Sequence, residues 1–227
     1  MRHKIKVYLL ALVVLITSLG YIISCTHDDI VLPEGGSSGS NITRGTAQIA
    51  LTDGKTTFDK VHSNVMWETP FLGEISLLTG RFNTFGFNSF HFEESNPDSI
   101  YFEAYVWLNS VNTSEPGRDQ GCLLNTFGTG KDIEYVDTNV AIIKTKKVIF
   151  STTDKGYIVT ADLTFHRVTK EITAKLDYSG KAQESTYDEY GFILQFSILA
   201  KTDFGIESTS IADNVNIRCD AAFKHSQ

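Results

Sequence analysis

The sequence predicts an all-β domain of antiparallel strands, closed as a barrel or stacked as a sandwich. From residue 46 onward, short stretches with an apolar residue at every second position recur, separated by turn residues such as Asp53-Gly54 and Asn96-Pro97-Asp98. Alternation with a period of two is typical of half-buried strands, and no long segment shows helical periodicity. The chain has 227 residues, a length that suits one such domain of about eight to ten strands.

The clearest strand runs from Ile100 to Leu108. Ile100, Phe102 and Leu108 fall on one face, and Tyr101 falls on the other. The strand is followed by a break at Pro116-Gly117. An apolar face that leads into a polar corner is expected of the wall and rim of a sheet.

The other strands place further apolar side chains on the same inner face. We expect two short helical pieces at most, around residues 71–78 and 118–127. Whether the inner face fills a solid core or encloses a ligand is left open by the alternation itself. The inner-face residues that we take as candidates for ligand binding are Val65, Trp67, Phe82, Phe85, Phe102, Val106, Leu163, Phe165, Phe192, Leu194 and Phe196.

The amino terminus has the pattern of a secretory signal. Arg2, Lys4 and Lys6 precede an apolar run over 7–23, and Ser24-Cys25 follows it. A positive start, an apolar run and a small residue before the cut define a signal peptide. The alternative is an uncleaved membrane anchor, although about 17 residues is short for a transmembrane helix.

A cysteine directly after the small residue resembles the lipobox of bacterial lipoproteins. The resemblance implies a signal peptide over 1–24 and acylation of Cys25, with palmitate-like chains that anchor the protein to a membrane. Residues 25–45 are rich in Gly and Ser, so we expect them to form a flexible linker. We therefore expect a location in the cell envelope, most simply the outer membrane, on its periplasmic side or at the cell surface.

The net charge limits the possible binding partners, and the cysteine content limits the possible disulfides. The formal net charge is −7, which argues against nucleic acid, whose binding needs clustered Lys and Arg. Cys122 and Cys219 could pair, but two separate thiols that behave as small apolar residues are the simpler interpretation.

No motif in the sequence predicts an enzyme, a metal or a cofactor. The titratable candidates are His62, His91, His166, Asp119 and Asp203, and none has the spacing of a metal site or a nucleophile motif. His62 and Ser63 are adjacent and would point to opposite faces of a strand. We interpret His62 and His166 as hydrogen-bonded rim or turn residues, and Arg118-Asp119 as a corner salt bridge or helix cap.

A set of short motifs recurs along the predicted domain. In chain order the motifs are His62-Ser63, Gly80-Arg81-Phe82, Ser110–Thr113, Arg118-Asp119, Leu163–Lys170 and Thr202–Ile206. In this order and at these intervals, the set resembles the YceI-like family of bacterial periplasmic proteins. The Arg-Asp corner, the Leu-Thr-x-His-x-x-Thr-Lys run and the Asp-Phe-Gly-Ile end are the specific parts. Together they extend over about residues 58–217.

The resemblance implies a lipocalin-like antiparallel β-barrel of about eight strands over residues 46–227. It also implies a polyisoprenoid or quinone-type lipid inside the barrel. Three positions depart from the family pattern: Arg167 replaces a usual Gly, Lys201 a usual Arg, and Gly121-Cys122 a usual His. These departures affect the rim of the barrel.

We therefore predict a cell-envelope lipoprotein that binds, stores or carries an isoprenoid lipid. The expected partners are that lipid and, through acylated Cys25, a membrane, and a homodimer is left open. The alternative is an interaction or adhesion module whose barrel is a ligand-free solid core. A third hypothesis, an enzyme that uses His62, predicts a turnover that His62→Ala removes.

Overall fold

The computed structural model describes residues 47–73, 75–130, 139–209 and 211–227. The predicted signal peptide, Cys25 and the linker lie outside the described residues. No helix within the described ranges combines the length and the apolar character needed to cross a membrane.

A single antiparallel sheet of twelve strands forms the described part of the chain. Hydrogen-bonded neighbours follow the order β1-β5-β6-β8-β9-β10-β11-β12-β3-β4-β7, and β2 pairs with β12. The strands are β1 (Gln48–Ala50), β2 (Thr56–Phe58), β3 (Asn64–Phe71), β4 (Ser76–Phe82), β5 (Phe85–Glu93), β6 (Tyr101–Trp107), β7 (Val111–Asn112), β8 (Val140–Ser151), β9 (Gly156–Phe165), β10 (Val168–Gln183), β11 (Tyr187–Leu199) and β12 (Asn214–Ser226).

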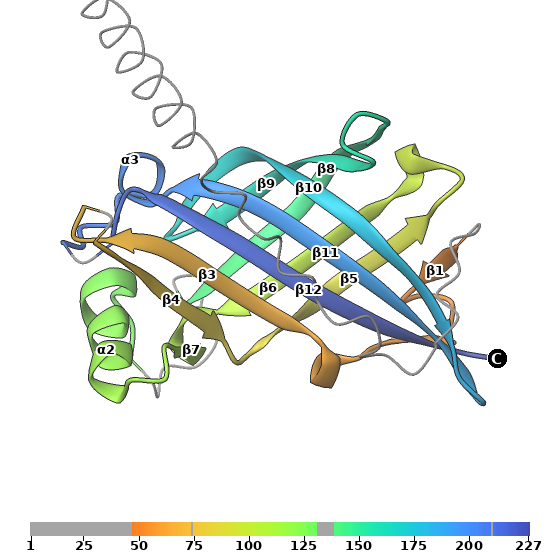
Figure 1. Ribbon diagram of the computed structural model, residues 1–227, viewed down its shortest axis with the longest axis horizontal. Helices are drawn as coiled ribbons and strands as arrows, with labels where there is room; N and C mark the ends of the chain where they lie inside the picture. Colours follow the sequence, from red (N-terminus) through yellow and green to blue (C-terminus); the bar gives the residue numbers. More distant parts are fainter. Residues whose placement is uncertain (1–46, 74, 131–138, 210) are drawn as a thin grey trace, which may run out of the picture. The chain divides into compact units, whose positions relative to one another are not determined.

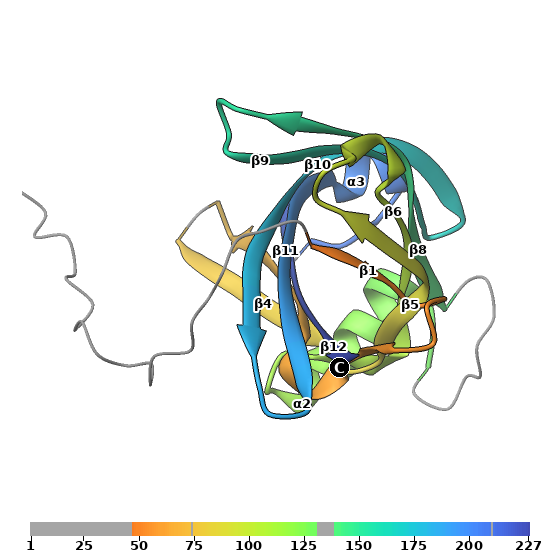
Figure 2. The same cartoon turned by 90° about the vertical axis from the view of Figure 1, so that its right-hand side faces the viewer.

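The sheet curls around a central axis, as the two views show (Figure 1, Figure 2). Its path has two ends, β1 and β7, so the ring of hydrogen bonds is not closed within the described residues. Bulges where the register shifts, such as the one between Tyr178 and Gly180 in β10, give the long strands extra bend. The predicted all-β, lipocalin-like class is confirmed, with a curled sheet in place of a fully hydrogen-bonded ring.

Short helices lie at the strand connections. They are the α-helices α2 (Pro116–Gly121) and α3 (Ala200–Phe204), the π-helix η4 (Cys122–Phe127), and the 3-10 helices η1 (Lys60–His62), η2 (Pro97–Ser99) and η3 (Leu108–Ser110). The helix expected over residues 118–127 is present as α2 and η4. In Figure 1, α2 and α3 lie at the opposite end of the sheet from β1 and the carboxyl terminus.

The helix expected over residues 71–78 is wrong. Within this segment Phe71 ends β3 and residues 76–78 begin β4, and the turn between them has Leu72 (φ 47°) and Gly73 (φ 69°) in the left-handed region. Two successive positive φ angles reverse the chain and cannot continue a right-handed helix. Leu78 pairs with Thr69 across the hairpin and both are buried, so strand pairing uses the apolar residues that resembled a helix face.

The last strand is also longer than the sequence indicated. The apolar alternation by itself predicts a short strand over residues 215–219, whereas β12 extends from Asn214 to Ser226 and pairs with β11 along its whole length. The sequence of its carboxyl-terminal half does not suggest a strand, because this half carries the polar residues Lys224 and His225. Phe223 on its inner side is nevertheless fully buried. Pairing on both sides, with β11 and with β2 or β3, holds these polar residues in a strand.

The β1 end of the sheet is packed solid with aromatic rings. The Phe92 ring lies 4.8 Å from that of Phe192, 5.1 Å from that of Tyr178 and 5.5 Å from that of Tyr157, between centroids. Phe92 is fully buried. Edge-to-face and tilted pairs at these distances are the favourable geometry for aromatic packing, so this half of the interior is a conventional core.

Candidate lipid-binding cavity

The other half of the interior is hollow. A cavity of about 180 Å³ lies between β3, β4, β5, β6, β11 and β12, and η4 contributes to its lining. One water molecule needs about 10–15 Å³ on this measure, so the space equals on the order of a dozen waters. At about 30 Å³ per water in the liquid, this volume is at the lower end of small-molecule pockets.

Strand alternation directs the lining side chains inward. On β11, Phe196 and Ile198 face the cavity, whereas Gln195, directly before Phe196, faces solvent. On β12, Ile217 and Cys219 face the same space. These four inner-face residues are only partly buried, whereas Phe192 on β11 and Phe223 on β12, in the packed half, are buried. Their exposed surface therefore faces unfilled space.

All eleven residues predicted as the inner face contribute to the lining of this one cavity. They come from β3 and β4 (Val65, Trp67, Phe82), β5 and β6 (Phe85, Phe102, Val106), β9 (Leu163, Phe165) and β11 (Phe192, Leu194, Phe196). The structure thus brings them together, and their role in binding a ligand remains a prediction.

Several lining residues were missed by the sequence reasoning. Ile198 and Ile217 continue the alternation of their strands, so a stricter count along β11 and β12 would have found them. Ile206 and Ile211 lie in the loop that follows α3, and Phe127 lies on η4. No periodic signal marks these three, because a loop and a short helix reach the cavity only through the tertiary fold.

The end of the cavity near the helices is covered by η4 and α3. Leu123 and Phe127 of η4 are buried, and the Phe127 ring lies 6.0 Å from the ring of Phe165. Phe204 of α3 lies 5.4 Å from the same Phe165 ring. These contacts close the hollow half with side chains from three separate elements.

Charged groups are almost absent from the cavity wall. Asp220 is the charged residue of the lining, and Arg218 binds its carboxylate through Nε at 3.1 Å and an Nη atom at 2.7 Å. Thr69 also lines the cavity, and its hydroxyl donates to the carbonyl of Asn214 at 2.9 Å. With these polar groups satisfied, the remaining wall offers a ligand mainly apolar contact.

Cys122 and Cys219, in the described part of the chain, are free thiols, and both line the cavity. Burial raises the pKa of the Cys219 thiol to about 12, with a smaller contribution from Asp220. Burial also raises the pKa of the Cys122 thiol, and nearby Asp119 adds to the effect. Thiols with raised pKa values are poor nucleophiles at neutral pH, so they act as small apolar wall residues.

The titratable candidates named from the sequence have structural partners. Nδ1 of His166 lies 3.0 Å from the carbonyl oxygen of Phe204, which ties the β9–β10 turn to α3. Asp119 accepts hydrogen bonds from the amide and hydroxyl of Thr113, both at 2.7 Å, and so fixes α2 to the end of β7. Asp203 forms an ion pair with Lys170 at 3.4 Å, and His91 stacks on Tyr101.

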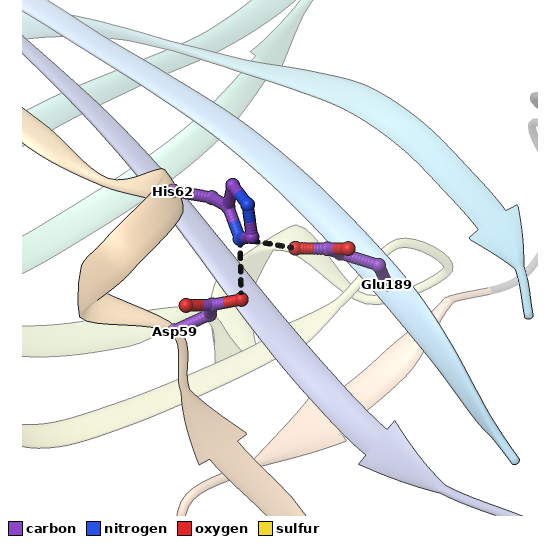
Figure 3. Close-up of side chains that lie close together, drawn as sticks. All are labelled: Asp59, His62 and Glu189. Carbon is purple, nitrogen blue, oxygen red and sulfur yellow. Dashed lines mark hydrogen bonds and ion pairs between the residues drawn. The ribbon is translucent and has the colours of Figure 1, made fainter.

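His62 belongs to a polar cluster outside the cavity. Its Nδ1 lies 2.7 Å from an Asp59 oxygen and 3.8 Å from a Glu189 oxygen. Figure 3 shows these three side chains pointing toward one another. The Asp59 oxygen that contacts His62 also contacts Lys224 Nζ at 2.5 Å. Although Asp59 is buried, these hydrogen bonds outweigh desolvation and hold the pKa of its carboxyl well below its usual range. Both oxygens of the Asp59 carboxylate are engaged, Oδ2 by Lys224 and His62 and Oδ1 by the amide of Val61, so we assign the cluster a structural role.

A curled antiparallel sheet around an apolar cavity defines the class of lipocalin-like proteins that enclose ligands in a barrel. Residues 57–223 match the model of the YceI-like domain. The chain therefore belongs to the YceI-like family. A UPF0312 protein of Vibrio parahaemolyticus is 30% identical over 148 residues, which are 64% of this chain and 72% of that protein.

Solved structures share the fold at low sequence identity. BcnA of Burkholderia cenocepacia superposes with a TM-score of 0.56 at 14% identity, over 73% of this chain and 99% of that one. The YCEI protein of Campylobacter jejuni superposes with a TM-score of 0.54 at 19% identity, over 67% of this chain and 88% of that one. At these identities the likeness shows the fold alone.

Proposed function

We propose that the domain binds an apolar, chain-shaped lipid of the isoprenoid or quinone class inside the hollow half of the sheet. The observation that carries this proposal is the apolar cavity itself, whose lining contains all eleven inner-face residues. A ligand-free module with a solid core does not require such a space. The family to which the chain belongs supports the isoprenoid class.

The expected affinity follows from the size of the cavity. A ligand of about 20–25 heavy atoms at about 0.3 kcal/mol per atom gains about 6–7.5 kcal/mol, which corresponds to a dissociation constant of about 3–40 μM. A longer chain would extend beyond the space and gain further contacts. Binding is passive burial, and no chemical step is assigned to the chain.

We further propose that the domain is held at the cell envelope through an acyl group on Cys25. The support is the sequence pattern of a signal peptide followed directly by a cysteine. Mass spectrometry of the mature amino terminus tests this assignment. A chain that begins before Cys25, or that carries an unmodified Cys25, would contradict it.

The lipid proposal is tested by extraction. An organic extract of the purified protein should contain an apolar chain lipid at near-stoichiometric yield, as measured by mass spectrometry. The absence of any such lipid, after expression under several lipid supplies, would contradict the proposal.

Matched substitutions on one strand sharpen this test. Phe102→Glu places a carboxylate in the apolar cavity, so it should abolish lipid loading or unfold the domain. Tyr101→Glu is the control, because Tyr101 directly precedes Phe102 on β6 and its side chain is 44% exposed on the outer face. Phe196→Glu and Gln195→Glu form a second pair on β11. Normal folding and loading of both inward variants would show that the inward assignment is wrong.

A further inference from the structure

A polar recess lies beside η1 and adjoins the cavity. Lys60 and His62 of η1 and Arg81 and Asn83 near the end of β4 contribute to its wall. Four residues line both spaces: Asn64, Phe82, Phe85 and Asp220. The apolar cavity and the polar recess are therefore neighbours that share one wall.

The sheet is interrupted at this wall. β4 and β5 follow each other in the chain through Asn83 and Thr84, but neither strand pairs with the other: β4 pairs with β3 and β7, and β5 pairs with β1 and β6. β2 pairs with β12 and likewise does not pair with β5. The contact between β2 and β5 is made by rings, with Phe58 of β2 at 6.1 Å from Phe85 and 5.0 Å from Phe87 of β5. Side chains can rotate without breaking a hydrogen-bonded ladder, so this is the place where a ligand can pass from one space to the other.

The uncompensated charge at the recess is positive. Lys60 and Arg81 are exposed there, and neither forms an ion pair with another described residue. Lys60 Nζ lies over the Phe85 ring, 5.7 Å from its centroid. The acidic member of the wall, Asp220, is already bound by Arg218. In a chain of formal net charge −7, two free cations at the border of an apolar cavity favour an anionic group.

We propose that the recess binds the anionic head group of an amphiphile whose apolar tail lies in the cavity. This inference rests on the function proposed above and adds the chemical class of the head group, a phosphate or a carboxylate. Arg81 offers a planar fork of donors to two anionic oxygens, and Lys60 offers a mobile point charge. The tail then passes between Phe82 and Phe85 into the hollow half.

The test compares ligands that share a tail and differ in the head. Geranylgeranyl phosphate, geranylgeranoic acid and geranylgeraniol are each added to the delipidated full chain in a mild detergent, and native mass spectrometry measures the bound fractions. We expect at least one of the two anionic ligands to bind about tenfold more tightly than the alcohol, a factor typical of one charge-assisted contact. Comparison of the phosphate with the carboxylate identifies the head group.

Charge-removing variants place the contact. Arg81→Gln and Lys60→Gln should each reduce the preference for the anionic ligand severalfold and leave binding of the alcohol unchanged. Lys147→Gln is the control, because it removes one exposed cation from β8, outside the recess. An alcohol that binds as tightly as both anions, or a preference that survives in both recess variants, would overturn the head-group assignment alone. Failure of all three ligands to bind would instead contradict the lipid-binding function.

Discussion

At the scale of single residues, the cavity depends on the pairing of Trp67 with Gly80. The two residues are directly opposite in the β3–β4 ladder, and the indole lies on the glycine. A Cβ atom on residue 80 would lie 2.5 Å from Trp67 Cζ2 and 2.9 Å from Nε1. The absence of a side chain at Gly80 therefore allows a large aromatic ring to lie flat against the wall.

Gly80→Ala should force the indole away from the wall and toward the cavity. We expect a loss of about 1–3 kcal/mol in the free energy of unfolding, as for overpacked cores, together with reduced lipid loading. Urea denaturation and the extraction assay measure the two effects. Gly121→Ala is the control, because an added Cβ there meets no atom within 4 Å and alanine favours the helix. Equal stability and loading in both variants would contradict this account of the wall.

The turn between β9 and β10 explains one departure from the family pattern. His166 (φ 50°) and Arg167 (φ 66°) are both in the left-handed region, which a two-residue hairpin of type I′ requires. Glycine adopts this conformation without steric cost, which accounts for its usual presence at the position of Arg167. In this chain the contact of His166 with Phe204 helps to hold the turn.

At the scale of elements, the turn between β1 and β2 is organised by one carboxylate. Asp53 accepts hydrogen bonds from the amides of Lys55 and Thr56, at 2.7 and 2.6 Å, and from the Thr56 hydroxyl at 2.6 Å. Although partial burial acts to raise the pKa of Asp53, these bonds outweigh it and lower the pKa to about 2. The turn is thus stabilised by the ionised form.

The depressed pKa predicts a loss of stability in acid. An aspartate in the unfolded chain has a pKa of about 3.9, so the contribution of Asp53 is fully present above about pH 4 and is lost as the pH falls through about 2. A shift of this size corresponds to about 2.6 kcal/mol for a shielded group, and screening by solvent at this exposed turn reduces the contribution to about 1 kcal/mol. Urea denaturation between pH 2 and pH 5 should show a flatter profile for Asp53→Asn than for the wild type. Asp98→Asn is the control, because Asp98 is exposed and lies outside this turn. If the unfolding free energy of Asp53→Asn depended on pH as strongly as that of the wild type, the assignment of this acid effect to Asp53 would be wrong.

At the scale of the whole molecule, the interior is divided into a packed half and a hollow half. Phe92, Phe192 and Phe223 belong to an aromatic cluster at the β1 end, where Phe90 and Phe223 stack at 4.0 Å between centroids. Phe196 and Ile217 border the cavity at the other end. Stability and ligand binding are therefore expected to depend on different parts of one sheet.

Truncation of a ring in each half tests this division. Phe92→Ala creates a new void among packed rings and should cost about 3–5 kcal/mol in the free energy of unfolding. Phe196→Ala removes a ring that is already beside empty space, so it should cost about 1–2 kcal/mol, since fewer packing contacts are lost. The two free energies are measured by urea denaturation of delipidated protein. Equal losses of unfolding free energy in the two variants would contradict the division into a packed half and a hollow half.

Much of this architecture followed from the sequence by itself. Period-two alternation along strands such as Ile100–Leu108 fixed which side chains face inward, because successive residues on a strand point to opposite faces. The eleven residues selected in this way all line one cavity. Short motifs such as Arg118-Asp119 indicated the family to which the chain belongs.

Tertiary structure alone decided whether the inner face encloses space. Phe92 and Phe196 have the same pattern in the sequence, yet one is fully buried among rings and the other borders the cavity. Alternation reports the direction of a side chain, whereas a cavity depends on the distance between strands that are far apart in the chain. The recess could not be predicted from the sequence for the same reason. It forms where η1, β4 and β12 meet, and these elements place Lys60, Arg81 and Asp220 around one polar space.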